Sequence, residues 1–69
     1  MPPSRYIITA KIRVACQLLI GSKSTIDEIS EQIGLESCIY FYRMFKRKTG
    51  MTPNEFRRSD NQEEIIRRL

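Results

Sequence analysis

The three glycines of this chain, Gly21, Gly34 and Gly50, limit the length of its secondary-structure elements, because each follows a stretch with helical periodicity. In chain order, these stretches run roughly from Ser4 to Ile20, from Ile26 to Ile33 and from Cys38 to Thr49. No stretch shows the alternation that is typical of a strand. The sequence therefore predicts an all-α fold with a long first helix, and a chain of 69 residues has room for one small domain.

Apolar side chains mark the inward face of each predicted helix. These are Ile8, Ile12, Ala15 and Leu19 in the first helix, Ile26, Ile29 and Ile33 in the second, Phe41 and Phe45 in the third, and Phe56 in a short fourth helix from Asn54 to Arg58. They recur at intervals of three and four, which places them on one side of each helix. The first helix is also apolar on adjoining faces, at Tyr6, Ile7, Val14 and Leu18. This is more apolar surface than one small neighbour covers.

Polar residues before these helices predict how each one begins. Ser24 or Thr25 can cap the second helix, with Asp27 or Glu28 completing a capping box. Ser37 can cap the third helix, and the pair Thr52-Pro53 can open the fourth. Residues 60–69 have a helix-forming composition, but nothing in the sequence fixes their position. We therefore expect a folded unit over residues 1–59 and a tail over 60–69 that can be helical.

The positive charge of the chain is concentrated in its second half. The net charge is +4 with a sequence pI of about 9.4. Residues 37–59 hold the cations Arg43, Lys46, Arg47, Lys48, Arg57 and Arg58 against the single anion Glu55. Asp27, Glu28 and Glu31 lie before this region. A solvated charged face is one interpretation of such a run, but the asymmetry favours a polyanionic partner.

Several functional classes find no support in the composition. No apolar run approaches the roughly 20 residues that cross a membrane, and the N-terminus does not resemble a signal peptide, so we expect a cytoplasmic protein. The chain has no histidine and only two cysteines, Cys16 and Cys38, which are far apart in sequence. We expect two free thiols, no metal site and no cofactor, and the alternative for Cys38 is a redox sensor. No nucleophile–base spacing and no glycine-rich phosphate loop indicates an enzyme.

Two short helices joined by a glycine-containing turn of about three residues describe a helix-turn-helix, whose second helix enters the major groove of DNA. The segments IDEISEQIGL, YFYRMFKRKTG and TPNEFR resemble the signature of the AraC/XylS family of bacterial transcription regulators. The preceding segment, YIITAKIRVACQLL, resembles the helix that links the two helix-turn-helix units of that family. The resemblance covers nearly all of residues 3–58. It implies a homeodomain-like bundle of about four helices that binds double-stranded DNA.

The resemblance also implies that this chain holds only the linker helix and the second unit of the family's DNA-binding domain. The favoured explanation is a C-terminal fragment of a longer regulator, and the alternative is a natural miniature regulator. The recognition helix would then be the segment at about residues 38–49. Ile39 stands where the family often has a serine, and Lys11 stands where it commonly has an arginine. Ile39 offers no hydrogen bond, but it can contact a thymine methyl group. Lys11 keeps the charge without the bidentate fork.

The residues expected to contact DNA lie mainly at the start of the third helix. Arg43 is the first candidate for a base or phosphate contact, and Lys46 and Arg47 are expected to bind phosphates. The alternative for Arg43 is a solvated side chain that pairs with Glu36 or Glu31. Tyr42 is expected to face DNA, whereas Tyr40 is expected to pack on the protein.

The remaining candidates lie at the helix starts. Cys38 flanks Ile39, and Ser37 caps its helix and is a further candidate for a phosphate contact. At the start of the second helix, Ser24 and Thr25 are expected to offer backbone N–H groups to a phosphate.

A second interpretation comes from a different class of function. The surplus apolar surface from Tyr6 to Val14 favours a small interaction module that binds RNA polymerase or a second copy of the chain through the first helix. The two interpretations are compatible, because they use different helices.

Overall fold

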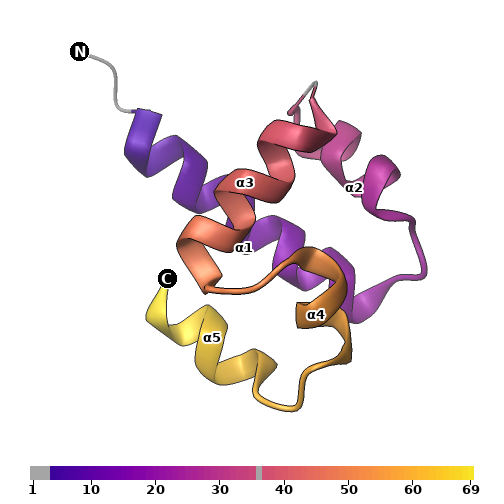
Figure 1. Ribbon diagram of the computed structural model, residues 1–69, viewed down its shortest axis with the longest axis vertical. Helices are drawn as coiled ribbons and strands as arrows, with labels where there is room; N and C mark the ends of the chain where they lie inside the picture. The colour runs from indigo at the N-terminus through magenta and orange to yellow at the C-terminus, as the bar shows by residue number, and fades with distance from the viewer. Residues whose placement is uncertain (1–3, 36) are drawn as a thin grey trace.

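The computed structural model describes residues 4–35 and 37–69, with side chains described from residue 7 onward. Five helices lie within these ranges: α1 (Ser4–Gly21), α2 (Ile26–Gln32), α3 (Cys38–Thr49), α4 (Pro53–Arg58) and α5 (Gln62–Arg68). The described residues contain no strand, so the predicted all-α class is confirmed. The count exceeds the expected four because residues 62–68 form a helix of their own (Figure 1).

Helix α1 is the central element of the bundle, because it contacts each of the other four helices. In Figure 1, α3 crosses in front of it, and α4 and α5 occupy the lower half of the view. The predicted inward positions Ile12, Ala15 and Leu19 are buried, and Ile8 is half-buried. The prediction about Tyr6 concerns a side chain outside the described part of the structure.

Three phenylalanines form the centre of the core. Phe41, Phe45 and Phe56 are completely buried. The rings of Phe41 and Phe45 meet edge to face at 5.7 Å, and those of Phe45 and Phe56 at 5.6 Å. Edge-to-face pairs of this kind each contribute about 0.5–1.5 kcal/mol beyond the burial of their area. This chain of ring contacts fixes α4 against α3 and keeps the inward face of α3 apolar.

The helix starts follow the predicted caps. Thr25 and Glu28 form a capping box at α2, and Thr52 and Glu55 form another at α4, where Pro53 occupies the first turn. Ser37 caps α3, and its hydroxyl oxygen accepts a hydrogen bond of 3.2 Å from the backbone N–H of Tyr40. Each cap satisfies N–H groups that the helix itself leaves without a partner. These local signals fix where α2, α3 and α4 begin.

The turn between α2 and α3 is held by backbone geometry and by a buried hydroxyl. Gly34 has a φ of +84°, which residues with a side chain adopt only at a cost. The buried Ser30 hydroxyl donates a 2.8 Å hydrogen bond to the carbonyl of Leu35, and the Leu35 N–H donates back to the carbonyl of Ser30 at 3.0 Å. These contacts set the angle at which α3 leaves α2.

Helix α5 is packed against the body of the protein. Ile65 is buried, and Ile66 and Leu69 are half-buried on the same core. The Gln62 side-chain amide donates hydrogen bonds to the carbonyls of Phe56 (3.0 Å) and Arg57 (3.1 Å), so it caps the end of α4. The acidic first turn and basic last turn of α5 also suit the helix dipole.

Candidate nucleic-acid interface

The outward face of α3 is a continuous exposed surface that is mostly cationic. Its members are Ile39, Tyr40, Arg43, Lys46 and Arg47, all of which are exposed. They recur at helical intervals on the side opposite the buried Phe41 and Phe45. We call these five residues the α3 outer face. Arg43, Lys46 and Arg47 therefore point away from the core, and the predicted inward positions of Phe41 and Phe45 are confirmed.

The cations of this face are not neutralised by described acids. Among the described side chains, those of residues 7–35 and 37–69, the only ion pair closer than 4.0 Å joins Arg68 and Glu64 on α5. The possible pairing of Arg43 with Glu31 is therefore absent from the described structure, while pairing with Glu36 concerns a residue outside it. Among the described side chains, the Arg43 guanidinium has no acidic partner within 4.0 Å.

One acid lies near the cationic surface without pairing closely with it. The pKa of the Glu55 carboxyl is lowered, first by the hydrogen bond from the Thr52 backbone N–H and further by the Thr52 hydroxyl and the charges of Lys46 and Arg58. Glu55 therefore stays ionised as part of the α4 cap. Lys46 forms no ion pair with Glu55 within 4.0 Å and is exposed.

The two tyrosines of α3 lie in the opposite arrangement to the predicted one. Tyr40 is 41% exposed and belongs to the α3 outer face. Tyr42 is half-buried on the core, and its ring meets that of Phe41 edge to face at 6.3 Å. Tyr40 lies seven residues before Arg47, a spacing that places both on one side of a helix. This spacing is the signal in the sequence from which Tyr40 could have been predicted to be a surface residue.

Cys38 is turned toward α2 instead of outward. Its thiol donates a 2.7 Å hydrogen bond to an Asp27 carboxylate oxygen, and the side chain is half-buried. This hydrogen bond, together with partial burial and the nearby negative charge, raises the pKa of the Cys38 thiol. Cys16 is completely buried in the core, which raises the pKa of its thiol to about 12. Neither thiol therefore has the acidity of a reactive cysteine.

The backbone groups expected to bind a phosphate at the start of α2 are already used. The N–H of Thr25 donates to the Glu28 carboxylate at 2.8 Å, within the capping box. The N–H of Ser24 donates to the Ser22 hydroxyl at 3.4 Å. The proposed role of these two N–H groups is therefore corrected: they complete the cap and the loop before α2.

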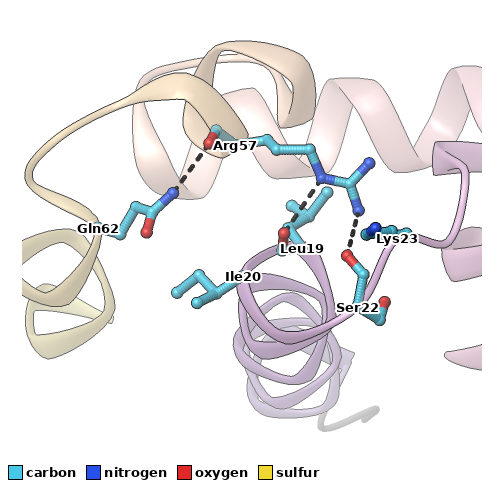
Figure 2. A pocket seen from close by; sticks show the side chains of 6 residues that line it. All are labelled: Leu19, Ile20, Ser22, Lys23, Arg57 and Gln62. Atoms are coloured by element: carbon cyan, nitrogen blue, oxygen red, sulfur yellow. Dashed lines mark hydrogen bonds between the residues drawn. The ribbon is translucent and has the colours of Figure 1, made fainter.

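Arg57 belongs to the fold, although the sequence places it in the basic region. Its guanidinium reaches from α4 to the carbonyls of Leu19 (3.1 Å), Ser22 (3.2 Å) and Ser24 (2.8 Å), as Figure 2 shows for the first two. These carbonyls end α1 and form the loop before α2. Arg57 therefore replaces hydrogen bonds that the end of α1 lacks. It was missed because its partners lie more than thirty residues away in the sequence.

Figure 2 also shows a hollow around this guanidinium. It is lined by Leu19, Ile20, Ser22, Lys23, Arg57 and Gln62. Because its most polar groups already hold the loop or cap α4, the hollow is a junction between elements.

Among the described residues, no cluster of histidine, cysteine or acidic side chains could hold a metal ion. In the same part of the chain, no helix combines the length and apolarity needed to cross a membrane.

Comparison with known proteins agrees with this geometry. A family model described as a helix-turn-helix domain matches residues 1–59. The chain belongs to the AraC/XylS-type helix-turn-helix family. The AraC-type assignment follows from the named relatives. No solved structure is significantly similar to the chain.

Three relatives illustrate the family. The transcriptional activator RhaR of Salmonella arizonae is 42% identical over 90% of this chain and 22% of its own length. The bifunctional transcriptional activator and DNA repair enzyme AdaA of Bacillus subtilis is 36% identical over 86% of this chain and 28% of its own length. The MmsAB operon regulatory protein of Pseudomonas aeruginosa is 31% identical over 90% of this chain and 20% of its own length. The chain thus spans less than a third of the length of these AraC-type relatives.

Proposed function

We propose that this chain is a sequence-specific DNA-binding subdomain of an AraC-type transcription regulator, consisting of the linker helix and the second helix-turn-helix unit. Helix α3 inserts its outer face into the major groove, and α2 braces it against the DNA backbone. The proposal assigns the chain no catalytic role and no cofactor, and it places the protein on DNA in the cytoplasm.

The main support is the separation of charge and apolar surface on α3. Arg43, Lys46 and Arg47 are exposed together, while Phe41 and Phe45 are buried beneath them. Cations on one side of a helix can neutralise the phosphates that flank the groove and release their counterions. Arg43, near the N-terminal half of α3, is placed for a base or phosphate, and the other two for phosphates.

Binding to duplex DNA at several salt concentrations tests the proposal. A single unit that neutralises a handful of phosphates should bind non-specific DNA with a Kd of about 10⁻⁴ to 10⁻⁶ M at physiological salt. The double variant Arg43→Ala/Lys46→Ala should bind more weakly and show a smaller slope of log K against log salt, by roughly 0.9 for each phosphate that is no longer neutralised. Fluorescence anisotropy with a labelled duplex measures both quantities.

The matched control is Arg67→Ala/Arg68→Ala, which removes the same charge from α5. Both arginines are exposed, so both double variants should keep their folds and the control should keep most of the binding. Equal losses in the two variants would show that only total charge matters. Binding that is independent of salt would contradict the electrostatic part of the proposal.

A second candidate function rests on α1. Ile7 and Val14 remain 45% and 48% exposed, and with Ala10 they line an open apolar groove that also includes Gln32 and Ile33. This face supports self-association of the chain through α1. Light scattering during size-exclusion chromatography should then show a dimer that Val14→Glu converts to a monomer. A monomer at every concentration would contradict self-association, and it would leave the face free for a partner such as RNA polymerase.

A further inference from the structure

The α3 outer face has two chemically different halves. Ile39, in the first turn, is 75% exposed, the largest exposed fraction among the described large apolar side chains that remain exposed. Tyr40 lies beside it, and the cations begin one turn later, at Arg43. The other exposed large apolar residues, Ile7, Val14 and Ile20, all lie on α1. An apolar first turn is therefore particular to this end of α3.

The polar groups around Ile39 are already engaged by the protein. The Ser37 hydroxyl accepts from the Tyr40 N–H at 3.2 Å, and the Cys38 thiol donates to Asp27 at 2.7 Å. Of the side chains from Ser37 to Tyr40, the tyrosine hydroxyl remains as a hydrogen-bonding group without such a contact. The first turn of α3 therefore presents mainly carbon atoms to a partner.

Duplex DNA offers one apolar group in the major groove that varies with sequence, the 5-methyl group of thymine. Guanine offers two acceptors, N7 and O6, that match the fork of an arginine. Residues at the N-terminal end of a recognition helix are those that reach base edges. The two halves of the α3 outer face thus match two different base edges.

We propose that Ile39, with Tyr40 beside it, selects DNA sites by packing against a thymine methyl group, and that Arg43 reads a guanine nearby. This inference rests on the proposed function of α3. Ile39 and Arg43 are separated by four residues, or about 6 Å along the helix axis. Because successive base pairs are about 3.4 Å apart, the thymine and the guanine lie about two base pairs from each other.

Site selection followed by removal of single methyl groups tests this inference. Duplexes that bind the chain are selected from a randomised pool, and each thymine of the selected site is then replaced by deoxyuridine, which lacks only the 5-methyl group. For the wild-type chain, one replacement should weaken binding about three- to fivefold, the effect of leaving one methyl group unburied. The Ile39→Ala variant should bind the thymine and deoxyuridine duplexes equally.

The matched variant is Arg43→Ala, which should bind more weakly but remain sensitive to deoxyuridine at the same position. Ile39 is largely exposed, so Ile39→Ala should melt at the wild-type temperature, and circular dichroism checks this. If no sequence is enriched from the pool, the proposed sequence-specific function itself fails. If a sequence is enriched but no deoxyuridine replacement matters, or if the effect persists in Ile39→Ala, the thymine inference is overturned while specific DNA binding stands.

Discussion

The Nζ atom of Lys11 on α1 donates a 2.6 Å hydrogen bond to the carbonyl oxygen of Ile33, the C-cap residue of α2. A carbonyl in the last turn of a helix has no partner within that helix, so this hydrogen bond supplies one from another element. It also ties the central helix to the turn that aims α3. Lys11 is half-buried, and a side chain at Gly34 would approach its Nζ atom to 2.9 Å.

This relationship predicts different costs for alanine at two glycines. Gly34 and Gly50 have nearly the same backbone conformation, with φ of +84° and +86°, so Gly34→Ala and Gly50→Ala share a conformational cost of about 1–2 kcal/mol. At Gly50 an added Cβ meets nothing within 4 Å, whereas at Gly34 it displaces Lys11. Because the Lys11 Nζ atom is the end of a flexible side chain, it can shift and keep part of its hydrogen bond, so Gly34→Ala should lower the free energy of unfolding by roughly 0.5–1 kcal/mol more than Gly50→Ala.

Urea denaturation of the two variants measures this difference. Repeating the pair in a Lys11→Met background provides the control, since the excess at Gly34 should disappear when there is no ammonium group to displace. Equal losses of stability in the wild-type background would mean that Lys11 moves aside without cost.

A second prediction concerns Arg57, whose replacement should affect the stability of the fold and not the binding of DNA. Arg57→Ala removes the three hydrogen bonds to Leu19, Ser22 and Ser24 and should lower the free energy of unfolding by about 1.5–3 kcal/mol. The neighbouring Arg58 is exposed, so Arg58→Ala removes the same charge with little effect on stability. Arg57→Lys should be intermediate, because lysine keeps the charge without the fork. Similar unfolding midpoints for Arg57→Ala and Arg58→Ala would contradict this role.

The features that could be predicted from the sequence are those with local causes. The capping residues Thr25, Ser37 and Thr52 each bond to a group three residues away, so their roles could be predicted from spacing alone. Phe41 and Phe45 likewise share a face whatever the fold around them. The family resemblance was also carried by such local segments and was confirmed by the match over residues 1–59.

The features that could not be predicted depend on contacts between distant segments. Lys11 meets Ile33, and Arg57 meets Leu19, only once α1 has packed against α2 and α4. The tyrosines are a different case, because their positions follow from local helix geometry. With a rotation of about 100° for each residue, Tyr42 lies about 80° and Tyr40 about 120° from the midpoint between Phe41 and Phe45 around the helix axis. The helical positions alone therefore identify Tyr42 as the tyrosine nearer the core.

A third prediction concerns the reactivity of Cys38. Asp27→Asn removes the carboxylate that accepts the thiol hydrogen bond and contributes negative charge, so the raised pKa of Cys38 should move back toward its ordinary value of 9.0. More thiolate is then present at pH 8, and Cys38 should react faster with a disulfide reagent. Absorbance of the released thiolate follows the rate, and the buried Cys16 should stay unreactive until the protein unfolds. Cys38→Ser should abolish the fast reaction, and an unchanged rate in Asp27→Asn would show that the carboxylate does not control the thiol.

The cap of α4 gives a prediction about pH. The pKa of Glu55 is lowered in the folded state, chiefly by the Thr52 backbone N–H, so the ionised carboxylate stabilises the fold. Because the folded pKa lies below the ordinary value of 4.5, this contribution is fully present above pH 4.5 and is lost as the pH falls through the folded pKa. Glu55→Gln keeps a side chain that can complete a capping box but removes the charge. The difference in free energy of unfolding between wild type and Glu55→Gln should therefore be constant near pH 7 and shrink below pH 4.5. Denaturant unfolding at each pH measures it, and a carboxyl that titrates at or above 4.5 by NMR would contradict the prediction.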